Sequence, residues 1–362
     1  MSLFLPQTLP PVEQVVPPVP APPPAATPAP AAVVYESAWQ KTIESDAALQ
    51  IATGATHVFV TGAKARLTAF AAADGAEAWA KELPSETRLA TGEGLVFVVS
   101  GGKLHALAEP TGAERWSIAL PGPTTGPVWS KGLVVFSSGR EIVACRAADG
   151  SEIWRAHVDV ETAQPIVIES GRVLGVLASK TIVVLDLVTG SNLKRMLPDP
   201  VPGELAAAGD RFYFAADDGV VYAYKVTSED REWAFPIRVN GVGAPVVDDR
   251  CVYVAFLDNS VQAFHRDSGN RCWSSRTLKG RPAAGPILAG SQLVIPLTNS
   301  ELVVVGVKDG KLADTSAGGA AGQSQPATAT LQAVAASPDA SSVYVVSVGG
   351  DQRRVLTARR RK

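Results

Sequence analysis

Four polar side chains stand at matching points in successive segments of this 362-residue chain and could together bind a polar ligand. Each lies seven or eight residues before a short apolar run, and they are Gln50, Arg88, Gln164 and Glu204. A guanidinium flanked by amide groups suits a carboxylate, such as that of a peptide. The alternative is that all four are solvated residues at the rim of a water-filled channel, where polar side chains are expected.

The other residue types that commonly carry catalysis or bind metals are scattered along the chain. The four histidines and three cysteines show no metal-ligand spacing, and no Ser-His-Asp, Cys-His or paired-carboxylate arrangement can be defended from spacing. We therefore predict no catalytic residue, no metal site and no bound cofactor.

Two of the cysteines, Cys251 and Cys272, fall on the second and fourth strands expected within one segment. With a strand between them, their Cα atoms should lie about 10 Å apart, which exceeds the reach of a disulfide. We expect Cys145, Cys251 and Cys272 to be buried thiols that pack as small hydrophobic residues.

A repeated pattern positions these side chains. A strand with alanine on one face leads into an Asp-Gly or Thr-Gly turn, and tryptophan follows four residues after the glycine, most clearly at 67 to 79, 104 to 116 and 142 to 154. Weaker copies keep the spacing but place Lys194 or Asp314 at the tryptophan position, or Glu229 at the glycine position. Equivalent positions 79, 116, 154, 194, 233, 273 and 314 give a period of 37 to 41 residues. Such a period indicates a solenoid, a propeller or another repeat array.

Each repeat also contains two further short apolar runs, which are separated by turns such as Lys131-Gly132 and Ser138-Gly139. Runs rich in Val, Ile, Phe and Tyr between Gly, Asp and Asn indicate antiparallel strands joined by hairpins. Four strands in a repeat of about forty residues are typical of a β-propeller blade, so we predict an all-β fold.

The two ends of the chain together supply one more blade. Trp39 lies in an expected outermost strand with no inner strands before it, whereas residues 343–346 and 356–358 form expected inner strands with no outer strand after them. Joining these segments predicts an eight-bladed propeller of four-stranded antiparallel blades over residues 35–362, closed by the N-terminal strand. This closure removes two open sheet edges.

The blade resembles the PQQ-like (pyrroloquinoline-quinone) repeat over roughly residues 36–358. The tryptophan of that family packs between neighbouring blades, which implies a blade-docking role for Trp39, Trp79, Trp116, Trp154, Trp233 and Trp273. At this length the chain is similar to the BamB-like single-domain members. That resemblance implies a non-catalytic interaction scaffold of the bacterial cell envelope, whose protein partner would be the outer-membrane β-barrel assembly machinery.

Two other functions are compatible with the same fold. Quinoprotein dehydrogenases that use this repeat look much longer and hold the quinone under an adjacent Cys-Cys pair, with Ca²⁺ on acidic and amide side chains. The isolated cysteines here depart from that pattern, so a PQQ-dependent oxidoreductase is the second hypothesis. A sensor that binds a small polar ligand at Arg88 and Glu204 is the third.

The chain ends and the overall charge bear on location and partners. The proline-rich residues 1–34 predict a disordered, extended spacer. Neither a signal peptide nor a transmembrane segment is recognisable, so the sequence taken literally indicates a cytoplasmic protein. Because the chain resembles envelope proteins and has a spacer, we expect instead a periplasmic or other envelope location, with this N-terminus mature or truncated. A net charge of −2 argues against nucleic acid as a partner, and we expect a monomer. We expect the basic cluster at residues 353–362 to be a solvated strand end, with contact to acidic lipid or an acidic partner as the alternative.

Overall fold

The structure is a computed structural model that describes residues 35–44, 49–62, 65–85, 87–196, 203–228, 230–276, 278–312, 330–337, 339, 341–349 and 351–361. The predicted spacer, residues 1–34, lies outside this described part, as do Glu229 and Asp314. All the elements assigned in the described residues are β-strands, as the sequence predicted.

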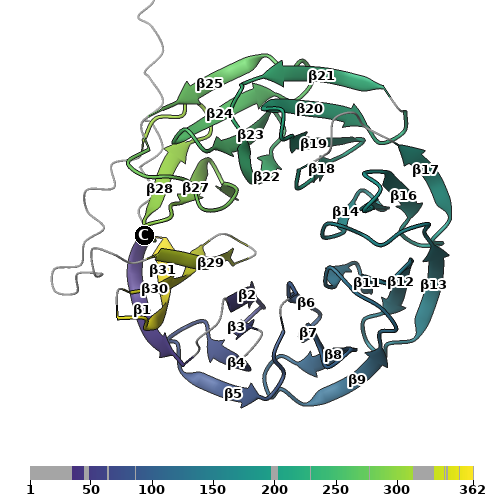
Figure 1. Ribbon diagram of the computed structural model, residues 1–362. Helices are drawn as coiled ribbons and strands as arrows, with labels where there is room; N and C mark the ends of the chain where they lie inside the picture. Colours follow the sequence, from purple (N-terminus) through teal and green to yellow (C-terminus); the bar gives the residue numbers. More distant parts are fainter. Residues whose placement is uncertain are drawn as a thin grey trace, which may run out of the picture. The chain divides into compact units, whose positions relative to one another are not determined.

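The propeller consists of eight antiparallel sheets arranged around a common axis (Figure 1). Within the described residues, seven sheets have four strands and the remaining sheet has three. The predicted eight-bladed propeller is therefore confirmed. We number the blades along the chain, beginning with the sheet that contains β2.

The first four blades follow one another in sequence order. Blade 1 contains β2 (Leu49–Thr53), β3 (His57–Gly62), β4 (Ala65–Ala71) and β5 (Glu77–Lys81). Blade 2 contains β6 (Ala90–Gly92), β7 (Leu95–Ser100), β8 (Lys103–Ala108) and β9 (Glu114–Ala119). Blade 3 contains β10 (Val128–Ser130), β11 (Leu133–Ser138), β12 (Glu141–Arg146) and β13 (Glu152–His157). Blade 4 contains β14 (Val167–Glu169), β15 (Arg172–Val176), β16 (Ile182–Asp186) and β17 (Asn192–Met196).

The last four blades include the one that joins the two ends of the propeller. Blade 5 contains β18 (Ala206–Ala208), β19 (Arg211–Ala215), β20 (Val220–Lys225) and β21 (Arg231–Pro236). Blade 6 contains β22 (Gly241–Val247), β23 (Cys251–Phe256), β24 (Ser260–His265) and β25 (Arg271–Ser275). Blade 7 contains β26 (Ile287–Ala289), β27 (Gln292–Pro296) and β28 (Leu302–Gly306). Blade 8 contains β29 (Thr330–Ala336), β30 (Ser342–Val348), β31 (Arg354–Arg361) and β1 (Tyr35–Ile43).

Blade 8 closes the ring by pairing the first strand with the last. β1 and β31 run antiparallel, with registers from Tyr35 opposite Arg361 to Ile43 opposite Arg354. The N-terminal strand thus occupies the outermost position of the blade, as predicted. This pairing satisfies the backbone groups of an edge that would otherwise be open to another chain.

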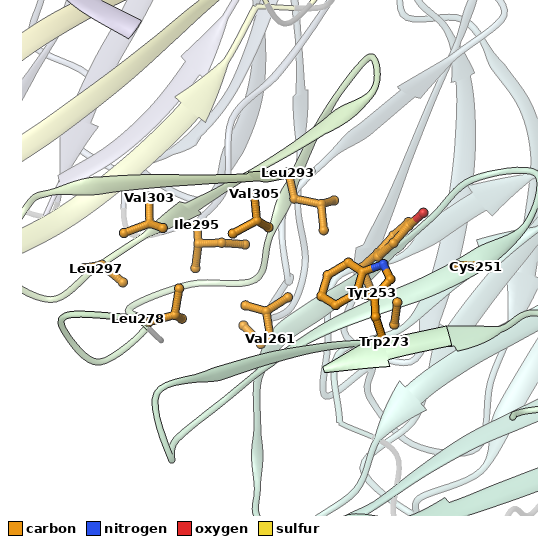
Figure 2. Packing of buried hydrophobic residues seen from close by; sticks show 12 residues of the cluster. Cys251, Tyr253, Val261, Trp273, Leu278, Leu293, Ile295, Leu297, Val303 and Val305 are labelled. Atoms are coloured by element: carbon orange, nitrogen blue, oxygen red, sulfur yellow. The ribbon is translucent and has the colours of Figure 1, made fainter. Parts of the chain in front are cut away.

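The hydrophobic core lies between the blades, because each sheet buries both faces against its neighbours. Between blades 6 and 7, for example, Tyr253 and Trp273 pack with Leu293 and Val305, all nine-tenths or more buried (Figure 2). Alternating strand residues therefore belong to two different interfaces, which explains why the middle strands are apolar on both faces.

Six tryptophans connect neighbouring blades in a single repeated geometry. Each indole Nε1 donates a hydrogen bond of 2.8–3.1 Å to a carbonyl oxygen of the following blade, three residues before its turn glycine. The donors are Trp39, Trp79, Trp116, Trp154, Trp233 and Trp273, and the acceptors are Ala72, Glu109, Ala147, Leu187, Arg266 and Val307. The tryptophans attributed to blade docking by resemblance thus lie at the blade junctions.

The small residues of the repeat make room for these rings. Trp79 lies opposite Ala69 on the adjacent strand, and its indole reaches over that alanine to Phe59, with ring centroids 5.8 Å apart. On the following blade, a side chain at the turn glycine would overlap the indole of the preceding blade. Alanine and glycine at these two positions therefore leave the space that the tryptophan ring occupies.

A buried carboxylate, Glu109, adds a tie between blades 1 and 2. Its side chain accepts hydrogen bonds from the backbone N–H groups of Ala55, Thr56 and His57, at 3.2, 2.7 and 3.0 Å. Burial by itself would raise the pKa of Glu109, but the hydrogen bonds from Thr56, Ala55 and His57 outweigh it and lower the pKa. The ionised carboxylate therefore holds the turn between β2 and β3 against blade 2.

Replacing Glu109 by glutamine is expected to lower the free energy of unfolding at neutral pH by about 1–3 kcal/mol. The amide keeps the size of the side chain but turns two N–H donors toward backbone donors. Because the folded-state pKa is lowered, the advantage of glutamate over glutamine should be complete above the unfolded pKa of about 4.3 and shrink as the pH falls below it. Urea unfolding of both proteins at pH 7 and pH 3.5 measures the difference in their free energies of unfolding at each pH. If this difference were the same at the two pH values, Glu109 would not act as an ionised carboxylate.

The basic C-terminal segment agrees only in part with the sequence expectation of a solvated strand end: Arg353, Arg360 and Arg361 are exposed, but the other two described arginines are not. Arg354 is 7% exposed and donates to Gln332 of β29 at 3.1 Å. Arg359 donates to the carbonyl of Ser300 on blade 7 at 3.0 Å, and burial lowers its pKa. These guanidinium groups are engaged within the fold because β31 is an interior strand of blade 8, covered on one edge by β1.

Candidate functional site

The four channel-mouth residues predicted from the sequence come from blades 1, 2, 4 and 5. Gln50 lies near the start of β2, opposite Thr61, and Gln164 lies in the segment that precedes β14. Both of these side chains are half-buried. Arg88 precedes β6 and Glu204 precedes β18, so both lie at the entry to an innermost strand.

The structure brings Arg88 and Glu204 together. The Nη2 atom of Arg88 donates a 2.9 Å hydrogen bond to Oε2 of Glu204, although blades 2 and 5 are not neighbours. The loop before β6 is set by close backbone packing, since a side chain on Gly126 of blade 3 would lie 2.9 Å from the carbonyl oxygen of Arg88. This ion pair joins the inner ends of two separated blades, and Gln50 and Gln164 are not part of it.

The chemistry available here follows from the exposure of the pair. The Arg88 and Glu204 side chains are 55% and 42% exposed, so both remain accessible to solvent. An incoming carboxylate would have to compete with Glu204 for the guanidinium, whereas an incoming cation would compete with Arg88. Ligand binding at the channel mouth stays a prediction.

Replacing Arg88 by alanine is expected to change the free energy of unfolding by less than about 1 kcal/mol, because the ion pair is solvated and screened. Glu204→Ala should behave in the same way, and the double variant should lose no more than the sum of the two. Urea unfolding of the three variants at low and high salt measures this coupling. A loss above about 2 kcal/mol would show that the pair holds the inner strands together, contrary to its exposure.

The cysteine prediction was wrong in two respects. Cys272 is exposed, whereas Cys145 and Cys251 are buried. The sulfur atoms of Cys251 and Cys272 lie only 2.8 Å apart, although β24 separates their strands. The strand-spacing argument failed because of a bulge: Ala263 pairs with Trp273 and Phe264 with Arg271, which leaves Cys272 as an extra residue on the outer strand. A bulge re-aims side chains and increases local twist.

A groove of about 540 Å³ lies between blades 8 and 1. Its walls include Gly54 and Thr56 just after β2, together with Asp339 and Arg360 of blade 8. Hydrogen bonds from the hydroxyl of Ser337 and the backbone of Ser341 lower the pKa of Asp339 to about 2. Gln50 is near the start of β2 and this groove adjoins its end, so the groove is separate from the channel mouth.

An exposed apolar group, which the sequence analysis missed, lies on blades 3 and 4. It comprises Ile153, Val188 and Leu193, which are 41%, 68% and 51% exposed. Ile153 and Leu193 hold equivalent positions, directly before the tryptophan position of their repeats, where other repeats have Arg115 or Glu232. The sequence could have revealed this group, because an apolar residue directly before the tryptophan position replaces the charged residue found in other repeats. Exposed apolar side chains mark a protein-binding site where they form one contiguous patch, so these three residues are candidates for such a site.

Two absences can be stated for the part of the chain that the structure describes. No group of three or more His, Cys, Asp or Glu side chains is arranged to hold a metal ion there. No helix of these residues is long and apolar enough to cross a membrane.

Comparisons with known sequences point to one family. The family described as outer membrane protein assembly factor BamB matches residues 36–104, 100–200 and 178–362. The outer membrane protein assembly factor BamB of Bordetella pertussis is 27% identical over 311 residues, covering 80% of this chain and 75% of that protein. The protein of the same name from Yersinia pestis is 24% identical over 271 residues, covering 72% of this chain and 61% of its own length.

Solved structures share the fold. The crystal structure of BamB from Moraxella catarrhalis superposes with a TM-score of 0.67 at 18% identity, covering 90% of this chain and 97% of that one. The quinohemoprotein alcohol dehydrogenase ADHIIG from Pseudomonas putida HK5 gives a TM-score of 0.62 at 12% identity, covering 90% of this chain and 76% of that one. At these identities the likeness concerns the fold alone.

Proposed function

The chain belongs to the family of the outer membrane protein assembly factor BamB, and we propose that it is a non-catalytic interaction scaffold in outer-membrane protein assembly. The observation that carries the proposal is the extent of the family match, which runs through all eight blades from residue 36 to residue 362. Its partner would be a component of the outer-membrane β-barrel assembly machinery, and its location the periplasmic side of the outer membrane.

We further propose that the exposed apolar group contributes to the docking of that partner. Val188 lies in the turn between β16 and β17, and Leu193 lies on β17, the outermost strand of blade 4. The turn is held by Asp186, which accepts hydrogen bonds from the backbone of Val188 and Thr189 at 3.0 and 2.8 Å. A rigid turn that presents an apolar side chain loses little conformational entropy on binding, which favours affinity.

The test is capture of partners by the tagged full-length chain in its source bacterium, after crosslinking in intact cells. Enrichment of a barrel-assembly component in the outer-membrane fraction is expected. Recovery of the chain without any such component would overturn the proposed role. If instead the purified chain gains a quinone chromophore and reduces a dye when pyrroloquinoline quinone and Ca²⁺ are added, the non-catalytic assignment fails.

A matched pair of variants tests the docking surface. Val188→Asp combined with Leu193→Asp should reduce capture by about tenfold, because desolvating two carboxylates opposes an apolar contact. Leu257→Asp is the control, since Leu257 is an apolar residue that is 38% exposed and lies on blade 6, which has no member of the exposed apolar group. If the two variants captured the partner equally, the exposed apolar group would not be the docking surface, but the proposed role in assembly would be unaffected.

A further inference from the structure

Blade 6 contains two thiols whose sulfur atoms lie close enough together that a small movement would let them form a disulfide. The sulfur atoms of Cys251 and Cys272 lie 2.8 Å apart. A disulfide requires about 2.05 Å, so an approach of less than about 1 Å would form the bond. We propose that Cys251 and Cys272 are a redox-active pair that forms a disulfide, linking β23 to β25 across the intervening strand of the blade.

The two thiols differ in access, and this difference sets the order of the reaction. Cys251 is 3% exposed, whereas Cys272 is exposed. Burial, with hydrogen bonding to Cys272, raises the pKa of Cys251 to about 12. Cys272 is therefore the thiol that meets an oxidant first, and Cys251 is the resolving thiol.

The oxidant would be a low-molecular-weight disulfide, RS–SR. The thiolate of Cys272 attacks one sulfur of RS–SR, which forms a mixed disulfide and releases RS⁻. Cys251 then loses its proton and attacks the Cys272 sulfur, and a second RS⁻ leaves. Both released thiolates take up protons, so two protein thiols are oxidised and one disulfide is reduced to two RSH.

The position of the pair gives the bond a structural consequence. Cys272 immediately precedes Trp273, whose Nε1 donates to the carbonyl of Val307 on blade 7 at 2.8 Å. Cys251 belongs to the same buried cluster as Trp273 and Tyr253 (Figure 2). A bond between the two sulfurs would fix the strand that carries this docking tryptophan. It would also persist in an oxidising compartment, whatever partner the propeller binds.

The proposal predicts a specific thiol count. The native full-length chain is treated with oxidised glutathione, quenched with acid, denatured and labelled with maleimide. The chain has three cysteines, so the reduced protein should take three labels and the oxidised protein one, at Cys145. Peptide mapping should recover a fragment linked between Cys251 and Cys272. Three labels after oxidation, or glutathione retained on Cys272 of the unaltered chain, would overturn the proposal.

Single variants separate the roles of the two thiols. Cys251→Ser should trap glutathione on Cys272, because the resolving thiol is gone. Cys272→Ser should remain reduced at both remaining cysteines, since Cys145 and Cys251 are buried. Cys145→Ala keeps the pair and should crosslink as the unaltered chain does. Oxidation should raise the melting temperature of the unaltered chain by several degrees and leave that of Cys272→Ser unchanged.

Discussion

Replacing Trp154 by alanine is expected to lower the free energy of unfolding by about 3–5 kcal/mol, the range typical of a buried aromatic side chain. Trp154 is only 7% exposed, and it is packed between blades 3 and 4. The substitution removes the indole from its contact with Gly190 and also removes the 2.8 Å hydrogen bond from Nε1 to Leu187. Urea unfolding of the two proteins measures the difference.

The neighbouring residue supplies the control. Ile153 is 41% exposed and adjacent in sequence, so Ile153→Ala should cost less than about 1 kcal/mol. Trp154→Phe keeps an aromatic ring but loses the hydrogen bond, so its cost should fall between the other two. If Trp154→Ala and Ile153→Ala unfolded at the same urea concentration, the tryptophan would not be a principal blade contact.

The repeat itself could be predicted because its signal is local. Strand, turn glycine and tryptophan lie within about a dozen residues of each other, and hairpin register fixes their relation. The sequence also contains a coupling that only the structure explains. The tryptophan of one blade packs on the turn glycine of the next, so Lys194 in place of tryptophan is followed by Glu229 in place of glycine. The position of Asp314 precedes blade 8, where the third and fourth strands come from opposite chain ends and no such turn exists.

Of the two blade junctions without this tryptophan, the one between blades 4 and 5 is filled by other aromatic side chains. Between blades 4 and 5, four aromatic side chains of blade 5 form a stack against Leu174 and Val184 of blade 4. Phe212 and Tyr224 have ring centroids 5.5 Å apart, and Phe214 and Tyr222 are 5.4 Å apart. Stacked rings supply the apolar area that the indole provides elsewhere. The weak repeat is thus compensated by aromatic residues on the two middle strands of the next blade.

The candidate sites were harder to predict because they depend on long-range or irregular geometry. Arg88 and Glu204 are 116 residues apart. Aligning the repeats places both at the start of an innermost strand, but it does not show which of the four channel-mouth side chains contact one another. The sulfur contact depends on a single bulged residue, which a count of strand spacings ignores. In the sequence Glu109 is an ordinary turn residue. Its role depends on three backbone N–H donors of the neighbouring blade, which only the structure shows.

The second large effect is expected at Gly190, the turn glycine on which Trp154 packs. Its φ of 68° disfavours any side chain, and an added Cβ would lie 2.5 Å from the indole of Trp154. Gly190→Ala should therefore cost about 3 kcal/mol or more in unfolding free energy, from strain and overpacking together. Gly171, in the same blade, has φ 75° and no atom within 4 Å of an added Cβ. Gly171→Ala should show the backbone cost alone, roughly 1–2 kcal/mol.

The two large effects should not be additive. In a chain that already carries Trp154→Ala, the ring that obstructs the new methyl group is absent, so Gly190→Ala should cost only as much as Gly171→Ala. The double-mutant cycle is then expected to give a coupling free energy of about 1–2 kcal/mol, with Trp154 and Gly190 stabilising the fold more together than separately. Strict additivity would mean that the indole does not rest on this glycine in solution. Coupling here and none between Trp154 and Gly171 would establish the tryptophan and the following turn glycine as one energetic unit, repeated around the ring.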